Sequence, residues 1–262
     1  MKPTISIVLP AKNEAQNLTA LLTKIKLVTP SAEILIVDDG STDSTSDLAK
    51  QAGARVISHP YSQGNGASIK TGARNASGDI LIFMDADGQH DPADIPVLLA
   101  KLNEGYDMVV GARSTQSQAS ILRRLGNGFY NRLASIMTGH KIDDLTSGFR
   151  AVRADKFRKF LYLLPNGFSY PTTSTMAFFR AGYSVGYTPI HVNKRIGKSH
   201  LKLTRDGVRF LLIIFKIGTL YSPLKVFFPV AMAVFGLGSL HYLNTYIDQG
   251  RFTNMSALLY VT

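Results

Sequence analysis

Two carboxylates, Asp85 and Asp87, come directly after the apolar run Ile80–Met84 and are separated only by Ala86. At the end of a strand, two such side chains can reach the same site once the chain turns. Carboxylate oxygens suit Mg²⁺ and Mn²⁺, which proteins commonly hold through one or two carboxylates plus substrate phosphates. Gln89 adds an amide oxygen two residues later. The segment predicts a divalent-ion site, with an ordinary acidic turn as the alternative.

Two other polar turns also follow apolar runs. They are Pro10-Ala11-Lys12-Asn13-Glu14 and Val37-Asp38-Asp39-Gly40-Ser41-Thr42-Asp43. Ligands of open α/β sheets bind at the carboxyl ends of the strands, so we expect all three turns to meet at one edge. A carboxylate of the second turn can accept hydrogen bonds from a nucleotide base or a ribose. Ser41 or Asp43 can also cap the next helix, and both roles are compatible.

A glycine pair, Gly64-Asn65-Gly66, precedes another predicted helix. Two glycines permit close backbone approach and positive φ angles. The segment lacks the full dinucleotide-binding spacing and the lysine of a P-loop. We therefore prefer a structural turn here over a phosphate-binding loop.

The elements that must position these turns alternate along the first half of the chain. We expect strands at 5–9, 34–37, 80–84 and 108–110, a weaker one at 56–57, and helices at 17–27, 44–51, 67–76 and 95–102. This alternation predicts an α/β fold with a mostly parallel sheet and helices on both faces. Further along, we expect helices near 120–138 and 173–181 and strands near 149–152 and 184–192.

The tail has a different composition. Residues 207–222 read as a helix lying at a membrane interface or as a core helix, and Val226–Ile247 contains 22 residues without a formal charge. A helix of that length spans roughly 33 Å, enough for a bilayer core. Basic residues precede this run, which predicts that the N-terminal domain lies on the cytoplasmic side of a membrane. The alternative is a buried hairpin of a soluble domain.

These observations predict three parts: a catalytic domain at 1–203, an amphipathic interfacial helix at 204–222, and one transmembrane helix plus the start of a second at 223–262. The N-terminus runs straight into a strand, so we expect no secretory signal. Gly236 and Gly238 would permit close helix packing in a homo-oligomer.

Charge is divided unevenly. Residues 1–110 carry 9 basic and 13 acidic side chains, net −4, whereas residues 111–262 carry 20 basic and 5 acidic, net +15. A uniformly basic nucleic-acid binder would not divide this way, so we expect no nucleic-acid partner. The chain has no cysteine, which excludes disulfide frameworks and thiolate chemistry. A hydrophobic content of 45% argues against disorder.

In their order and spacing, the three polar turns resemble the inverting family-2 glycosyltransferases with the GT-A fold. Two later segments, Asp144–Arg150 (DLTSGFR) and Arg195–His200 (RIGKSH), resemble the polyprenyl-phosphate branch of that family, typified by dolichol-phosphate mannose synthase and undecaprenyl-phosphate glycosyltransferases. The apolar tail matches that branch too, so the resemblance covers essentially the whole chain.

The resemblance implies transfer of a hexose from a nucleotide diphosphate sugar, such as GDP-mannose or a UDP-sugar, to a polyprenyl phosphate at the membrane surface. It implies Mg²⁺ or Mn²⁺ at Asp85, Asp87 and Gln89. The implied donor contacts are Pro10, Glu14, Val37, Asp38, Asp39, Asp85, Ala86 and Lys198. The implied acceptor-phosphate contacts are Arg113, Arg124 and Ser147, and the implied catalytic residues are Asp87, Arg113 and Arg195.

The chain has no tryptophan. It therefore cannot carry the Q-x-x-R-W motif of processive polysaccharide synthases, which disfavours a cellulose-type or chitin-type activity. Two alternatives stay open at this point: a glycosyltransferase with a hydroxyl acceptor, and a soluble sugar-nucleotide enzyme. A hydroxyl acceptor would need a general base, whereas a phosphate acceptor is already ionised. The residues identify neither the sugar and nucleotide nor the polyprenyl chain length. Asp144 could serve as a base or as a structural carboxylate, and we favour the structural role.

Overall fold

The computed structural model describes residues 3–113, 121–167, 169–192, 211–216, 218–220, 223–249 and 254. The chain forms two compact units, Met1–Ile214 and Phe215–Thr262, and each is described by itself. The predicted division at residues 203 and 222 stays a prediction.

The first unit is built on one seven-stranded sheet. Its strands are β1 (Ile5–Ala11), β2 (Glu33–Asp38), β3 (Arg55–Ser58), β4 (Ile80–Phe83), β5 (Met108–Arg113), β6 (Arg150–Arg153) and β7 (Val185–Ile190). They lie in the order β3-β2-β1-β4-β6-β5-β7. Only β6 is antiparallel to its neighbours β4 and β5, among the strands described. The carboxyl ends of β1, β2, β4 and β5 therefore meet at one edge, which the start of β6 joins.

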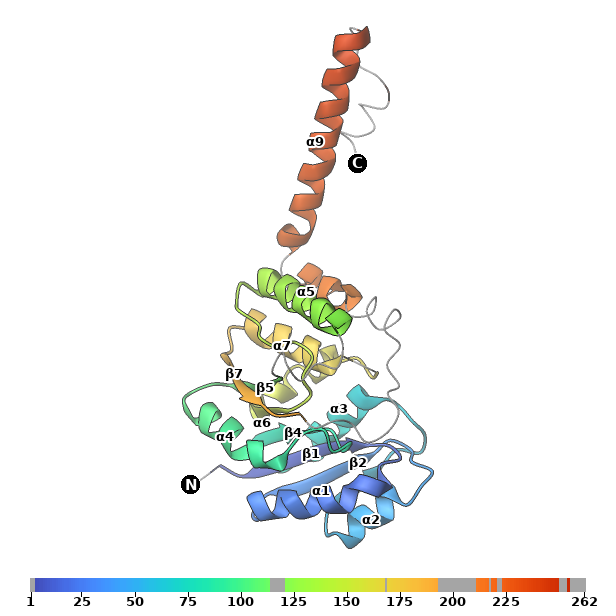
Figure 1. Cartoon of the computed structure of the whole chain (residues 1–262), viewed down its shortest axis with the longest axis vertical. Coiled ribbons are helices and arrows are strands. Elements are labelled where there is room, and N and C mark those ends of the chain that lie inside the picture. The colour runs from blue at the N-terminus through green and yellow to red at the C-terminus, as the bar shows by residue number, and fades with distance from the viewer. Residues whose placement is uncertain are drawn as a thin grey trace. The chain divides into compact units, whose positions relative to one another are not determined.

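Helices connect the strands and cover both faces of the sheet (Figure 1). They are α1 (Ala15–Val28), α2 (Thr45–Gln51), α3 (Asn65–Asn75), α4 (Ile95–Asn103), α5 (Ile121–Thr138), α6 (Ala154–Arg158) and α7 (Tyr170–Arg180), with short 3₁₀ turns η1 (Pro92–Asp94) and η3 (Leu161–Leu163). The long helices and all strands agree with the predicted positions to within a few residues. The short elements α6, η1 and η3 were not anticipated, because one or two turns carry too few residues to show a period.

Two hydrophobic cores explain why the strands lack alternation. Ile7 and Leu9 of β1 pack in one core with Leu18 and Leu22 of α1. Val8, between them, packs in the other core, which also holds side chains of α3, α6 and α7. Successive side chains of a strand point to opposite faces, so strands buried on both sides are apolar at nearly every position, the buried Ser6 of β1 being an exception.

The second unit contains one long helix, α9 (Pro223–Gln249). Its segment Pro223–Asp248 has 26 residues and a mean hydropathy of 1.7, so it is long and apolar enough to span a membrane. Only 6% of its most apolar 18-residue stretch is buried. Large apolar side chains such as Phe228, Leu237 and Leu240 are exposed along it. A helix with this exposure differs from the buried hairpin of a soluble core. Of the predicted interfacial helix, residues 211–216 and 218–220 are helical, and the remainder lies outside the described residues.

Candidate active site

The first two polar turns are joined by hydrogen bonds. Pro10 and Val37 are register neighbours on β1 and β2. Asn13, which has a positive φ of 56°, donates from its backbone N–H to Ser41 Oγ (3.0 Å) and accepts from Thr42 N at its side-chain oxygen (2.8 Å). The two turns therefore form one continuous wall at the carboxyl edge of the sheet.

Glu14 stands at the start of α1. Its backbone N–H donates to Thr45 Oγ1 (2.9 Å), so the residue is tied to the beginning of α2. Asp43 accepts hydrogen bonds from Thr45 and from the N–H of Ala15. Asp43 therefore bonds to the first residue of both helices, but the predicted cap at Ser41 or Asp43 is wrong, because the N-cap of α2 is Ser44 and its side chain makes no capping hydrogen bond.

The neighbouring carboxylates Asp38 and Asp39 are both buried, but they have different surroundings. Each oxygen of Asp39 accepts two hydrogen bonds, at 2.7–2.9 Å. The donors are His59 Nδ1 and Gln63 N to Oδ1, and Ser62 Oγ and Gly64 N to Oδ2. Burial opposes ionisation of Asp39, but these hydrogen bonds outweigh it and hold its pKa below the usual range.

Asp38 has fewer partners. Its Oδ1 accepts one hydrogen bond, from Ser41 N (2.9 Å). No described residue donates to its Oδ2, and that atom is not among the fully buried unsatisfied ones. Asp38 is therefore the carboxylate of this turn that can still accept a hydrogen bond from a ligand.

The segment after β4 turns sharply around Asp87. The buried Asp87 accepts a hydrogen bond from Gln89 N at its Oδ1 (3.1 Å), and Ala86 between the two acids is buried. His90 follows, and its ring stacks on Phe149 with the centroids 5.1 Å apart. Burial lowers the pKa of His90 to about 4, although Asp87 opposes the shift, so the imidazole is neutral at pH 7.

The loop Asp144–Phe149 lies against this acidic segment because β6 runs antiparallel to β4, with Phe83 opposite Arg150. A β-carbon placed on Gly148 would lie 3.0 Å from Asp85 Oδ2, so any side chain there would press on that carboxylate. With the stacking of Phe149 on His90, this contact docks two segments that are about sixty residues apart in sequence. The docking assembles the candidate site.

Arg113, the last residue of β5, contributes a cation to the same edge. It donates from Nε and NH2 to the two oxygens of Asp144, at 2.8 and 2.9 Å, and from NH2 to Thr146 Oγ1. Burial alone would raise the pKa of Asp144, but Arg113 lowers it below its usual value. Asp144 is therefore ionised and paired with Arg113. The Arg113 side chain is 27% exposed, and none of the described residues accepts from its NH1.

Arg150, the first residue of β6, was not singled out from the sequence as a site residue. Its side chain is fully buried and makes no ion pair with any described residue. It donates instead to four neutral oxygens: the carbonyls of Ser147 and Pro171 and the hydroxyls of Ser174 and Thr175. Arg150 thereby fastens the 144–149 loop to the start of α7.

The remaining predicted site residues are placed as follows. Ser147 is buried, and its hydroxyl has no hydrogen-bond partner among the described residues. Arg124 lies on α5, but its side chain is outside the described part of the structure, as are Arg195 and Lys198 altogether. The Gly64–Gly66 segment is a structural turn, as predicted, because N–H groups at the start of α3 donate to the carbonyls of Asn166 and Gly167.

The acidic segment alone supplies only some of the ligands that a divalent ion needs. The described residues contain no group of three or more His, Cys, Asp or Glu side chains that could hold a metal. Asp85, Asp87 and Gln89 offer two carboxylates and an amide oxygen, a hard donor set suited to Mg²⁺ or Mn²⁺. Oxygens of a bound phosphate group would complete the coordination.

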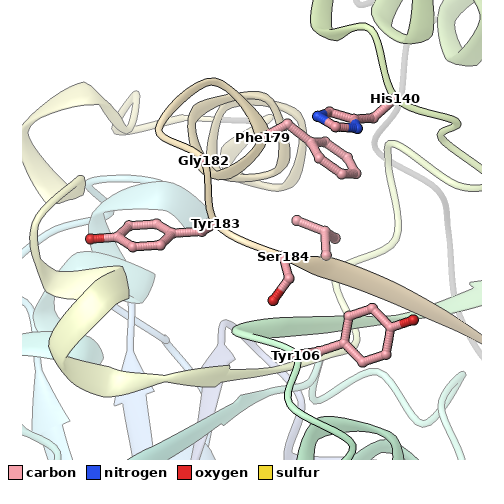
Figure 2. Close-up of a pocket in the computed structure, with 7 residues that line it drawn as sticks. Tyr106, His140, Phe179, Gly182, Tyr183 and Ser184 are labelled. Atoms are coloured by element: carbon pink, nitrogen blue, oxygen red, sulfur yellow. The ribbon is translucent and has the colours of Figure 1, made fainter.

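A hollow of about 380 Å³ lies elsewhere in the first unit (Figure 2). Tyr106, Ser184 and Val185 line it at the amino ends of β5 and β7. His140 and Phe179 also line it, and their rings stack on each other with the centroids 4.8 Å apart. Arg113 is at the carboxyl end of β5. Six residues of strand separate the two ends by about 17 Å, so this hollow is not part of the candidate site.

Comparison with known proteins gives the family. Residues 6–161 match the family described as Glycosyl transferase family 2. The chain belongs to glycosyl transferase family 2. The glycosyltransferase also matches, over residues 222–262, the family described as the GtrB C-terminal hairpin.

Two curated relatives of this glycosyltransferase bear polyprenyl-phosphate names. A dolichyl-phosphate hexose transferase of Haloferax volcanii is 29% identical, over 75% of this chain and 86% of that protein. An undecaprenyl-phosphate 4-deoxy-4-formamido-L-arabinose transferase of Salmonella choleraesuis is 36% identical, over 57% of this chain and 48% of that protein. The match thus spans about half the length of the Salmonella relative. The predicted family and its polyprenyl-phosphate branch are confirmed.

Solved structures agree on the fold. Glucosyl-3-phosphoglycerate synthase from Mycobacterium tuberculosis, in complex with Mn²⁺ and UDP-glucose, superposes with a TM-score of 0.68 and 22% identity, covering 82% of this chain and 79% of that one. The predicted GT-A architecture is therefore confirmed.

Proposed function

We propose that this glycosyltransferase moves a hexose from a nucleotide diphosphate sugar to a polyprenyl phosphate at a membrane surface. The observation that carries the proposal is the docking of the 85–90 segment on the 144–149 loop, with Arg113 beside it. That docking gathers acids suited to a diphosphate-bound ion and a cation suited to a second phosphate at one edge of the sheet. The names of the relatives and the exposed apolar helix α9 support the lipid-linked acceptor.

On the donor side, the wall made by the first two turns would hold the nucleotide. Asp38 would accept hydrogen bonds from the base or ribose through Oδ2, with Pro10, Val37 and Glu14 beside it. Asp39 would support this wall by holding the neighbouring loop of Ser62, Gln63 and Gly64 in place. Lys198, and Ala86 with its backbone between the two acids, would complete the donor contacts.

A divalent ion would be held by Asp85, Asp87 and Gln89, and when bound it supplies charge stabilisation for the departing diphosphate. Bound Mn²⁺ and UDP-glucose in the Mycobacterium structure support this assignment. Asp87 would orient the diphosphate, while Arg195 would neutralise the charge that grows on it.

On the acceptor side, Arg113 would use NH1 to bind the phosphate while Asp144 holds the rest of the guanidinium in place. Arg124 and the hydroxyl of Ser147 would bind the same phosphate. A phosphate oxygen is already ionised near pH 7, so it attacks the anomeric carbon without a base, from the face opposite the leaving group. This agrees with the surroundings of Asp144 and of the neutral His90, neither of which is poised to take a proton.

The membrane assignment places α9 in the bilayer and the catalytic unit on the cytoplasmic side. Basic residues before the apolar run support this orientation. A homo-oligomer formed through Gly236 and Gly238 and a second membrane helix after α9 are part of the same proposal.

The test uses the full chain in phospholipid nanodiscs. UDP-glucose, UDP-N-acetylglucosamine and GDP-mannose are titrated calorimetrically with Mn²⁺, and the donor that binds is then supplied radiolabelled with undecaprenyl or dolichyl phosphate. We expect label in the organic phase only when polyprenyl phosphate is present, and loss of transfer with EDTA that added Mn²⁺ or Mg²⁺ restores. Transfer to a polyprenyl alcohol as efficient as transfer to the phosphate would contradict the proposal and favour a hydroxyl acceptor.

A further inference from the structure

We infer that Asn131, on α5, is a positioning residue for the acceptor phosphate. Its side chain holds the backbone on both sides of Asp144, and Asp144 in turn orients the guanidinium of Arg113. That role rests on the proposed function, which assigns acceptor-phosphate binding to Arg113.

The carboxamide of Asn131 binds two backbone groups of the loop that follows α5. Its Nδ2 donates to the carbonyl oxygen of Asp143 at 2.7 Å, and its Oδ1 accepts from the N–H of Leu145 at 3.0 Å. Asp144 is the residue between these two groups. The donor and the acceptor of one side chain are therefore both used on the backbone that flanks Asp144.

This pair of hydrogen bonds restricts the backbone of Asp144. The carbonyl of Asp143 belongs to the peptide plane before Asp144, and the N–H of Leu145 belongs to the plane after it. Only the φ and ψ torsions of Asp144 relate the two planes, because each peptide unit is itself rigid. Holding both planes therefore sets the direction in which the Asp144 side chain leaves the backbone.

That direction matters because Asp144 points at Arg113. The carboxylate accepts from Nε at 2.8 Å and from NH2 at 2.9 Å, so the guanidinium is held in a bidentate pair. The Asp144 side chain is 8% exposed and that of Arg113 is 27% exposed. A tilt of the buried carboxylate would therefore turn the partly exposed guanidinium, including the NH1 group proposed to bind the phosphate.

α5 holds the same loop at a second place, which provides a matched control. Ser135, one turn after Asn131, accepts from the N–H of Ile142 at its Oγ (3.0 Å) and donates to the carbonyl of Asn131 (2.7 Å). The N–H of Ile142 does not belong to either peptide plane that flanks Asp144. Both side chains stabilise the loop, but only Asn131 acts directly on Asp144.

The experiment compares Asn131→Ala with Ser135→Ala in the full chain in nanodiscs. Both variants should fold, because alanine favours a helix more than asparagine or serine does, and because Asn131 is only half-buried, so that water can reach the freed backbone groups. Donor Kd is measured by calorimetry with Mn²⁺. Acceptor KM and kcat come from initial rates of transfer to polyprenyl phosphate.

The two variants should differ in one constant. We expect Asn131→Ala to raise acceptor KM roughly tenfold, an effect that the loss of two hydrogen bonds can produce, while kcat and donor Kd stay within about threefold of wild type. Ser135→Ala also removes two hydrogen bonds, but it should leave all three constants within about threefold of wild type. A merely structural role for Asn131 would not separate acceptor KM from the other two constants.

A double variant tests whether Asn131 acts through Arg113. In Arg113→Lys the bidentate pair with Asp144 is already lost, so there is little orientation left for Asn131 to maintain. Adding Asn131→Ala to Arg113→Lys should therefore raise acceptor KM by less than about twofold more. Two residues that act independently would multiply their separate effects.

Two further variants keep the test decisive. Asn131→Leu preserves the approximate size of the side chain and removes both hydrogen bonds, so it replaces the alanine variant if that one does not fold. Gly128→Ala changes the same helix at a position where a β-carbon meets nothing within 4 Å, and it should leave all constants unchanged.

Three results would overturn the inference: an unchanged acceptor KM in a folded Asn131 variant, an equal rise of acceptor KM in Ser135→Ala, or multiplied effects in the double variant. Failure of both Asn131 variants to fold would also overturn it, since the fold rather than the site would then require this residue. Failure of the proposed function would look different, because the wild-type chain would then transfer nothing to polyprenyl phosphate.

Discussion

Asp144 forms a bidentate salt bridge with Arg113, with Oδ2 2.8 Å from Nε and Oδ1 2.9 Å from NH2. The backbone N–H groups of Arg113, Thr146 and Ser147 also donate to this carboxylate, at 3.1–3.2 Å. The pair joins the end of β5 to the loop before β6. It leaves the guanidinium charged, oriented and partly exposed, which is the state that phosphate binding requires.

Replacing Arg113 tests that arrangement. Lysine keeps the charge but cannot make the two-point contact, so Arg113→Lys should cost about 1.5–3 kcal/mol of unfolding free energy, the usual range for hydrogen bonds to charged groups. In transfer assays it should raise acceptor KM roughly tenfold, equivalent to about 1.4 kcal/mol, with donor Kd unchanged. Loss of donor binding instead would assign Arg113 to the nucleotide side.

A side chain at Gly148 should push the Asp85 carboxylate aside by a few tenths of an ångström, because a β-carbon there would lie 3.0 Å from Asp85 Oδ2. Gly148→Ala should displace that carboxylate and weaken Mn²⁺-dependent donor binding roughly tenfold, about 1.4 kcal/mol. Calorimetric titration with and without Mn²⁺ measures the effect, with Gly128→Ala as the matched control. Equal donor affinity in the two alanine variants would show that Asp85 does not need this space.

Asp87 should be required for metal-dependent turnover. Asp87→Ala removes one of the two carboxylates proposed to hold the ion, and kcat should fall at least about a hundredfold at saturating Mn²⁺, or roughly 3 kcal/mol of transition-state stabilisation. Initial rates across a Mn²⁺ and Mg²⁺ series measure it. Turnover near the wild-type level would rule out the metal role of this residue.

The lowered pKa of Glu33 predicts that stability, rather than activity, depends on pH. Burial opposes its ionisation, but hydrogen bonds from Ser6, Ser77 and Arg55 outweigh that effect and lower its pKa to about 2. A depressed carboxyl pKa stabilises the fold above the unfolded-state value, and this contribution is lost as pH falls from about 4.5 toward about 2.

Glu33→Gln should therefore cost about 1–2 kcal/mol at pH 7, with the difference from wild type shrinking as pH falls below about 4.5. Chemical unfolding of both proteins at several pH values in a matched detergent measures this. A difference that stays constant between pH 7 and pH 3 would contradict the assignment.

The apolar helix α9 should insert into a membrane. An arginine near the centre of a membrane helix costs about 2.5–3.5 kcal/mol of insertion free energy. Leu237→Arg and Leu240→Arg, near the middle of Pro223–Asp248, should therefore release much of the protein from carbonate-washed membranes. Leu224→Arg, at the end of the helix beside Lys225, should have little effect because its side chain can reach the interface. Equal behaviour of all three variants would argue against a spanning helix.

Much of this molecule could be predicted from local patterns. The mainly apolar runs at Ile5–Leu9 and Ile80–Met84 indicated buried strands because strands covered on both faces need apolar side chains at nearly every position. Polar turns after those runs indicated the ligand edge, because parallel strands bring their carboxyl ends together. The roles of Asp38 and Asp39 could not be separated in this way, since adjacent identical residues carry no sign of which one a distant loop will occupy.

The amino-acid sequence by itself determined the order of strands and helices, the acidic edge and the uncharged tail, because each depends on periodicity and composition over neighbouring residues. Only the tertiary structure decided which charged groups are already engaged. The carboxylate of Asp144 is paired with Arg113, and that of Asp39 accepts hydrogen bonds from the loop before α3. Arg150 is buried and donates to neutral oxygens. These pairings join residues that are not neighbours in the chain. The pairing of Asp144 with Arg113 also depends on the antiparallel placement of β6 between β4 and β5, which local sequence does not encode.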